Sequence, residues 1–333
     1  MDKDLLKVSD LQTHFHTEEG VIKAVDGVNF TMQKGETLGI VGESGSGKSI
    51  LSMSIMGLVS TPPGEIKGKI EFKGRDLLAL SNAEYRKLRG RNLAMIFQEP
   101  MTSLNPVFTI GRQIEEVYKY HEHSSKKVAK QKAIEMLRLV GIPKPEDRYY
   151  DYPHQLSGGM RQRVMIAIAL ACNPELLIAD EPTTALDVTI QAQILQLMND
   201  LKLKFNTSLI IISHDFGVVS KVADRMLIMY AGKIVEYGTK EEIFNNPKHP
   251  YTEGLLSSIP NIDTPVDRLT TIPGTVPSPN DFPQGCAFHP RCKDAMPKCL
   301  AKQPNLIDTL NHSQVRCFKY EKGDVNDAKF VNS

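Results

Sequence analysis

The stretch ETLGIVGESGSGKS, residues 36–49, constrains the fold of this chain more than any other feature. An apolar strand runs into a glycine-rich loop that opens a helix, with the spacing G-x-x-x-x-G-K-[ST]. Glycines let the backbone curl until its N–H groups point at phosphate oxygens, and the helix N-terminus adds favourable dipole potential. We therefore predict a nucleotide-binding loop in which Lys48 reaches the β- and γ-phosphates and Ser49 ligates Mg²⁺. The predicted phosphate-binding residues are Gly42, Ser44, Gly45, Gly47, Lys48 and Ser49.

Apolar segments elsewhere predict a parallel sheet around this loop. The runs LLIAD (176–180) and SLIIIS (208–213) are continuous and apolar, and helical patterns lie between them, as is typical of strands covered on both faces. A hairpin follows at 226–238. Residues 1–40 carry short β-branched runs that predict antiparallel strands, and residues 112–140 have a helical pattern. We expect an α/β fold with an antiparallel β subdomain and a helical insert.

Two carboxylates follow the strand at 176–180. Asp180 and Glu181 lie at the strand end where open parallel sheets bind ligands, and adjacent strand residues point to opposite sides. Asp180 can hold Mg²⁺ through water, whereas Glu181 can orient and deprotonate the water that attacks the γ-phosphate. Alone, such a pair is as often a solvated acidic strand end; beside the phosphate loop, the catalytic interpretation is favoured.

A second phosphate-binding helix start occurs in QLSGGMRQRVMIAIAL. Ser157 is expected to cap an apolar helix that begins with Gly158 and Gly159, which leaves free backbone N–H donors suited to an anion. A chain with two such cradles either binds two nucleotides or completes a site on a partner.

In their order along the chain, these motifs resemble those of the ATP-binding cassette (ABC) ATPases. The resemblance implies a P-loop NTPase core that binds ATP and Mg²⁺ and whose signature loop closes on the ATP of another subunit. We place the nucleotide-binding domain at 1–245, its helical subdomain at about 99–164, and an irregular C-terminal extension at 246–333. The motifs that carry the resemblance are GESGSGKS, Gln98 in IFQEP, LSGGM, IADEP, TALD at 184–187 and His214 in ISHD.

The resemblance also implies roles for single residues. Gln98 is expected to sense the metal and to connect the helical insert to the core, and His214 to contact the γ-phosphate, so both join Glu181 as predicted catalytic residues. Asp187 is expected to communicate across the dimer. Phe15, in the early strands, is the candidate for stacking on adenine, although a phenylalanine on a strand is often only part of the core.

Residues 152–194 and 246–260 resemble the peptide-import subfamily, specifically the oligopeptide and dipeptide permease ATPase whose signature ends in Met. Met160 replaces the usual Gln and cannot supply a polar side-chain contact. The resemblance implies a peripheral subunit on the cytoplasmic face of the inner membrane that powers peptide import. Its implied partners are two membrane permease subunits, a second related ATPase and an extracytoplasmic peptide-binding protein. Nickel or another small solute stays open as the cargo, because related systems share these motifs.

The composition and the apolar runs agree with that expectation. Lys plus Arg number 40 and Asp plus Glu 39, so no net basic field favours nucleic acid, and we expect none as a partner. The longest apolar run, residues 164–172, is far shorter than the ~20 residues that span a bilayer, and the N-terminus has no run typical of a signal peptide. A soluble cassette ATPase of translation or DNA repair is the rival, but the chain shows neither a second cassette nor a long coiled coil.

Four of the five cysteines lie near the C-terminus, spaced C-x5-C-x6-C-x17-C. Thiols stay reduced in the cytosol, which argues against disulfides, and the spacing lacks the C-x2-C pairs usual for structural zinc. Four thiolates suit a [4Fe-4S] cluster, which some peptide-import proteins carry in this tail. Zn²⁺ and unligated thiols stay open as alternatives. Cys172 is expected to be a core thiol, and the candidate ligands are Cys286, Cys292, Cys299 and Cys317.

Overall fold

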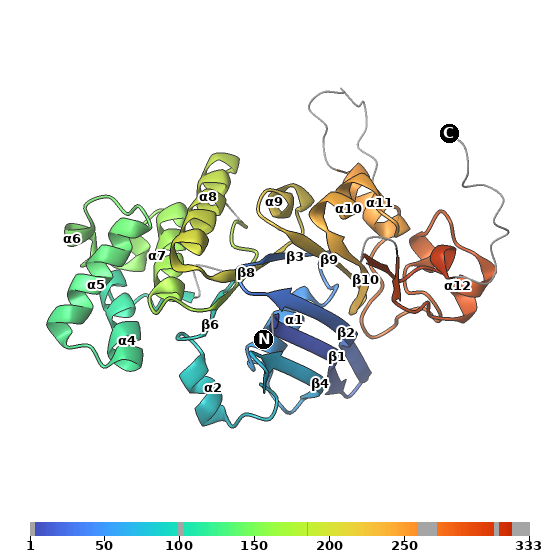
Figure 1. The fold of residues 1–333 in the computed structure, drawn as a ribbon, viewed down its shortest axis with the longest axis horizontal. Coiled ribbons are helices and arrows are strands. Elements are labelled where there is room, and N and C mark those ends of the chain that lie inside the picture. Colours follow the sequence, from blue (N-terminus) through green and yellow to red (C-terminus); the bar gives the residue numbers. More distant parts are fainter. Residues whose placement is uncertain (1–3, 99–102, 185, 259–271, 310–312, 322–333) are drawn as a thin grey trace.

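Two sheets frame the protein in the computed structural model, which describes residues 4–98, 103–184, 186–258, 272–309 and 313–321. One sheet has the strand order β2-β1-β4-β5, and the larger one has the order β11-β12-β10-β9-β3-β8-β7-β6 (Figure 1). The smaller sheet contains β1 (Asp4–Thr17), β2 (Gly20–Gln33), β4 (Gly64–Phe72) and β5 (Arg75–Asp76). The larger contains β3 (Thr37–Val41), β6 (Leu93–Ile96), β7 (Leu176–Asp180), β8 (Ser208–Ser213), β9 (Arg225–Tyr230), β10 (Lys233–Thr239), β11 (Ile307–Asp308) and β12 (Gln314–Val315).

The parallel core of the larger sheet confirms the prediction from the apolar runs. Strand β3 pairs in parallel with β8 and β9, and β7 pairs in parallel with β8 and β6. The predicted hairpin is β9–β10, and its turn is at Ala231 and Gly232. The early strands β1 and β2 are antiparallel, also as predicted.

The apolar strands serve two separate cores because successive side chains point to opposite faces of the sheet. On β7, Leu176 and Ile178 pack with α1 (Lys48–Ile55) and the antiparallel sheet, whereas Leu177 and Ala179 pack on the other face. The helices of that second face include α7 (Gly158–Leu170), α8 (Val188–Phe205), α9 (Phe216–Ser220) and α10 (Lys240–Asn245). Both faces of the central strands are therefore covered.

The helical insert between β6 and β7 differs from the single run predicted at 112–140. It contains α4 (Ile110–Glu122), α5 (Lys126–Leu139) and the short α6 (Pro145–Arg148) before α7. The run breaks because His123 adopts a left-handed φ of 54° and the Ser125 hydroxyl caps α5 by accepting from the backbone N–H of Val128. The predicted start of the insert, residues 99–102, lies outside the described residues. A further short helix, α2 (Asn82–Leu88), precedes β6.

The C-terminal extension is built from short elements that join the body of the protein. They include α11 (Pro250–Ser257) and α12 (Pro297–Ala301), and β12 pairs with β10, so the larger sheet continues into the extension (Figure 1). Tyr251 and Phe288 pack edge-on and tilted against Tyr230 of β9 and against each other. Within the described residues, none of the helices is long and apolar enough to cross a membrane.

A buried histidine at the junction with the extension makes the stability of this fold depend on pH. Burial lowers the pKa of His249 to about 3, whereas the unfolded chain has the ordinary value of 6.5. The folded state therefore binds fewer protons below pH 6.5, and stability falls as the pH drops from 6.5 towards 3. Its Nδ1 accepts from the backbone N–H of Tyr251 at 3.0 Å, which caps α11.

We predict that His249→Asn reduces this acid sensitivity, because Asn keeps a cap but does not titrate. Between pH 7 and pH 5, the wild type should lose about 2 kcal/mol more of its free energy of unfolding than the variant does. Urea denaturation at the two pH values measures the difference. An equal loss in both proteins would contradict a buried neutral imidazole.

Candidate active site

The glycine loop after β3 has the conformation that its sequence predicts. Gly47 has a φ of +100°, and a Cβ there would lie 2.2 Å from the backbone oxygen of Ala24. A Cβ on Gly42 would lie 2.3 Å from the backbone oxygen of Met229. Lys48 is buried, and its Nζ donates to the backbone oxygens of Gly42 and Glu43 at 2.7 and 2.9 Å. These hydrogen bonds tie the start of α1 back to the beginning of the glycine loop.

Two residues of the extension, Tyr251 and Arg291, form hydrogen bonds with Glu43 of the glycine loop. The backbone N–H of Glu43 donates to the Tyr251 hydroxyl at 2.8 Å, and the Arg291 guanidinium donates to both Glu43 carboxylate oxygens at 2.6 and 2.9 Å. Arg291 Nε also donates to the backbone oxygen of Pro273 at 2.9 Å. No local sequence pattern predicts these contacts, because Arg291 lies far along the chain from the glycine loop.

Glu181 lies directly after β7 and brings the predicted catalytic residues together. Its Oε1 is 3.1 Å from His214 Nδ1, while its Oε2 accepts from Gln98 Nε2 at 3.1 Å and from the Thr184 hydroxyl at 2.8 Å. The backbone turns sharply here, with a φ of 48° at Glu181 and a hydrogen bond from its N–H to the oxygen of Ile212 at 2.9 Å. Thr184 was not among the predicted residues.

Electrostatics keep the Glu181 carboxylate ionised. Burial by itself raises its pKa, but hydrogen bonds from His214 and Thr184 and the charge of Lys48 outweigh that effect, so the pKa lies below its ordinary value. The pKa of Lys48 is lowered by burial, against the charges of Glu181, Asp180 and Glu43. An anionic group therefore stands beside a cation in one partly buried site.

Asp180 has the features of a magnesium ligand. Burial raises its pKa against a hydrogen bond from Ser49, and its Oδ1 is buried with no hydrogen-bond partner among the described residues. A buried carboxylate oxygen without a partner is costly unless another group satisfies it. Mg²⁺ binds oxygen ligands, so Asp180 and Ser49 fit the ion that the sequence predicts.

A cavity of about 330 Å³ connects these groups to Phe15. Polar or charged side chains that line it are those of Lys48, Ser49, Gln98 and Glu181, and apolar ones are those of Phe15 and Ile22, which are paired on β1 and β2. Ser44, Gly45 and Gly47 also line it, as predicted for phosphate-binding residues.

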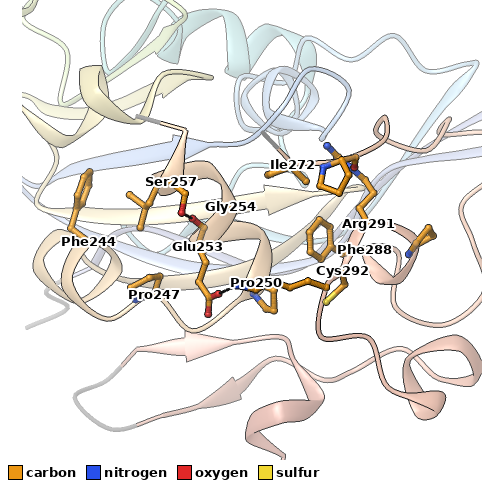
Figure 2. A pocket seen from close by; sticks show the side chains of 14 residues that line it. Phe244, Pro247, Pro250, Glu253, Gly254, Ser257, Ile272, Phe288, Arg291 and Cys292 are labelled. Carbon is orange, nitrogen blue, oxygen red and sulfur yellow. Dashed lines mark hydrogen bonds and ion pairs between the residues drawn. The ribbon is translucent and has the colours of Figure 1, made fainter. Parts of the chain in front are cut away.

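A larger cavity of about 730 Å³ lies in the extension, where Figure 2 shows Phe288, Arg291 and Cys292 on its wall. That cavity does not contain the residues of the glycine loop or Glu181, so size alone does not identify the active site. The charged and polar side chains of Lys48, Gln98 and Glu181 identify the smaller cavity as the candidate active site.

The second predicted phosphate cradle starts α7 as expected. The Ser157 hydroxyl caps the helix by accepting from the backbone N–H of Met160 at 3.3 Å, and Ser157 and Gly158 are exposed. Met160 packs its side chain against the core on the face of the larger sheet that α7 and α8 cover. Asp187 is exposed and caps α8 through the N–H of Ile190. The nucleotide cavity of the same chain is lined by other described residues, and its lining does not include Ser157, Gly158, Gly159 or Asp187.

The four C-terminal cysteines gather around one cavity but do not form a ready-made metal site. Cys286, Cys292, Cys299 and Cys317 all line it, and its volume of about 20 Å³ suits roughly one water molecule. Within the described ranges, no group of three or more His, Cys, Asp or Glu side chains is placed to hold a metal ion. Within the described residues, the thiols are thus not placed as the predicted iron–sulfur cluster would require.

Three of the four C-terminal thiols carry raised pKa values. Burial raises the pKa of Cys317 to about 11, and burial also raises the pKa of Cys286 and Cys292, with the neighbouring cysteines adding to it. They are protonated at neutral pH unless a cation binds. Cys172 follows α7 and is half-buried rather than fully in the core, and burial raises its pKa to about 11.

We predict that the ion pair between the extension and the glycine loop contributes measurably to stability. Arg291→Met should lower the free energy of unfolding by about 1–3 kcal/mol, because it leaves the Glu43 carboxylate without its partner in a partly buried position. Adding Glu43→Gln should recover part of the loss. The control is Lys293→Met, whose exposed ammonium pairs with Glu253 and should contribute less than about 1 kcal/mol. Urea denaturation measures all four proteins, and equal losses at the two positions would contradict the prediction.

Comparisons with known proteins agree with this geometry. Residues 25–184 match the family model described as ABC transporter, and residues 235–299 match the one described as oligopeptide/dipeptide transporter, C-terminal region. The chain is 57% identical to the oligopeptide transport ATP-binding protein AppD of Bacillus subtilis, over 96% of this chain and 97% of that protein. It is 50% identical to the dipeptide transport ATP-binding protein DppD of Escherichia coli, over 94% of this chain and 96% of that protein.

A solved structure shares the fold of the core. It is the dimeric ATP-binding cassette MJ0796 in a post-hydrolysis state bound to ADP and Pi, with a TM-score of 0.64, 28% identity, and coverage of 71% of this chain and 98% of that one. The relatives match nearly the whole length of this chain, and the motifs of the nucleotide site are in place. The chain therefore belongs to the ABC transporter family, in its group of oligopeptide and dipeptide transport ATP-binding proteins.

Proposed function

We propose that this chain hydrolyses ATP to power the import of short peptides through a membrane permease. The observation that carries the proposal is the contact of Glu181 with both Gln98 and His214 in the cavity that contains Lys48. The peptide cargo is supported by relatives at 50–57% identity that are named as oligopeptide or dipeptide transport proteins.

In the proposed reaction the triphosphate lies along the glycine loop, with Lys48 beside the β- and γ-phosphates. Its ammonium group must exchange the loop oxygens of Gly42 and Glu43 for phosphate oxygens, which are acceptors of higher charge. Glu181 then orients and deprotonates the attacking water, and His214 contacts the γ-phosphate. Three side chains donate to the Glu181 carboxylate, two of them to Oε2 and one to Oε1. Since a carboxylate can accept about four hydrogen bonds, Oε1 keeps an acceptor position for the attacking water.

Mg²⁺ would be held by Ser49, Asp180 and Gln98, and it would neutralise charge on the phosphates. The unpartnered Oδ1 of Asp180 supports this assignment. Phe15 would stack on adenine in the same cavity.

The chain would work as one half of an ATPase pair. Ser157 caps α7, which begins with Gly158 and Gly159, and Ser157 and Gly158 are exposed. This helix start does not line the nucleotide cavity of its own chain, which supports a role on the ATP of a second, related subunit. Asp187, exposed at the start of α8, would communicate across that interface.

The proposed complex also contains two membrane permease subunits and an extracytoplasmic peptide-binding protein, with this chain bound peripherally on the cytoplasmic side. The helical insert would receive the cytoplasmic helices of the permeases. Its exposed apolar side chains support that role, since Val107 is 70% exposed and Tyr150 58%. ATP-driven closure would switch the permeases between inward and outward access.

We predict that Glu181→Gln lowers Mg²⁺-dependent ATP hydrolysis by the complex about 10²–10⁴-fold, because the amide cannot accept a proton. ATP should still bind, and peptide uptake into vesicles carrying the complex should stop. Lys48→Ala should instead weaken ATP binding at least about tenfold, because it removes a charged donor beside the phosphates.

The matched control is Glu175→Gln, before the opposite end of β7, where the carboxylate pairs with Lys73 outside the cavity. It should retain hydrolysis and uptake. Wild-type turnover in Glu181→Gln would remove that residue from the catalytic role. If ATP hydrolysis by the complex responds to nickel and not to peptide, the proposed ATPase activity stands and the cargo is nickel instead of peptide.

The four C-terminal thiols are proposed as a metal-binding set for a [4Fe-4S] cluster, with Zn²⁺ as the alternative. Their convergence on one cavity supports the proposal, although they are not placed to ligate a metal without moving. The role would be structural or regulatory, because ATP hydrolysis needs no redox chemistry.

We predict that protein purified without oxygen is brown and contains about four irons per chain. Cys286→Ser or Cys317→Ser should abolish the absorbance, whereas Cys172→Ser, outside the cavity, should retain it. Colourless protein with one zinc would establish the alternative, and metal-free protein with a folded tail would refute both.

A further inference from the structure

A segment of the extension returns to the nucleotide cavity. Pro279 and Phe282 line the same cavity of about 330 Å³ as Phe15 and the glycine loop, although they lie far from both in the sequence. Neither residue belongs to the motifs that identify the nucleotide site. The wall of this cavity therefore contains residues of the extension as well as of the nucleotide-binding core.

Hydrogen bonds and packing hold this segment in place. Asn280 Nδ2 donates to the Glu19 carboxylate, next to the turn between β1 and β2, at 3.1 Å. The N–H of Asp281 closes a tight turn onto the backbone oxygen of Ser278 at 2.9 Å. Phe282 is half-buried and packs against the core on the face of the larger sheet that α7 and α8 cover. Packing therefore holds part of the side chain, and the rest remains accessible.

The position of these side chains in the cavity indicates what they bind. The charged side chains of Lys48 and Glu181 line the cavity together with residues of the glycine loop. Phe15, Ile22, Pro279 and Phe282 supply uncharged, largely apolar surface to the same cavity. A purine base has apolar faces that favour contact with aromatic side chains, so the cavity offers matching surfaces for both the phosphates and the base of a nucleotide.

We propose that Phe282 and Pro279 of the extension, together with Phe15, form the surface that contacts the base of the nucleotide. The proposal rests on the placement of adenine at Phe15 under the proposed function. It makes the extension a part of the ATP site. It also makes Phe282 a residue that contributes to affinity for the base rather than for the phosphates.

The test compares the binding of ADP and of pyrophosphate to the full chain by calorimetry, because pyrophosphate has the phosphates of ADP without its base. Phe282→Ala should weaken ADP binding about fivefold to tenfold and change pyrophosphate binding less than about twofold. Phe282→Tyr keeps the ring and should bind ADP like the wild type. The matched control is Phe244→Ala, which removes another half-buried phenylalanine that lines the larger cavity instead.

A second variant keeps the test valid if Phe282→Ala does not fold. Phe282→Leu retains apolar volume for packing and removes only the ring, so it should fold and bind ADP about threefold more weakly. If the Phe282 variants bind ADP with unchanged affinity and Phe15→Ala binds ADP more weakly, the role of the extension is overturned. The proposed placement of adenine at Phe15 would then still stand. Unchanged affinity in Phe15→Ala as well would overturn both. An equal loss for ADP and pyrophosphate would also overturn it, because the effect would then not involve the base.

Discussion

The buried ammonium group of Lys48 is the constraint on which the active site depends. A buried cation is costly unless nearby groups compensate it, and here burial lowers the pKa while Glu181, Asp180 and Glu43 oppose that shift. The loop oxygens that accept from Lys48 are free to do so because Gly42 and Gly47 let the backbone pass close to β2 and β9. The glycine loop thus curls around the Lys48 ammonium group, which donates to two of its backbone oxygens.

The two carboxylates at the end of β7 have different surroundings because of their positions. Asp180 is buried in the last position of the strand, and one of its oxygens has no protein partner among the described residues. Glu181 lies in the next turn with a left-handed φ and contacts Gln98 and His214 instead. Adjacent residues of the chain are therefore placed for the two proposed roles, which are metal binding at Asp180 and water binding at Glu181. Because Glu181 lies beyond the strand, its left-handed φ rather than strand alternation sets the direction of its side chain.

Local patterns in the sequence predicted those parts of the fold that depend on neighbouring residues. Continuous apolar runs identified β7 and β8, and the spacing of Gly42, Gly47 and Lys48 identified the loop that opens α1. The break in the helical insert was missed, although Ser125 is a typical helix cap and was a usable signal. The contacts of Arg291 and Phe282 had no such signal. They join segments that are remote in sequence, and only the tertiary fold brings an arginine or a phenylalanine of the extension to the loop.

These remote contacts give the extension a thermodynamic connection to the nucleotide site. Arg291 holds Glu43 of the loop and directly precedes Cys292, which lines the thiol cavity, so one short segment contacts both places. A ligand that binds only the folded arrangement of the loop stabilises whatever that arrangement includes. The effect is reciprocal in equilibrium binding: if nucleotide binding favours the ordered extension, then any ligand that orders the thiol cavity must favour nucleotide binding by the same factor.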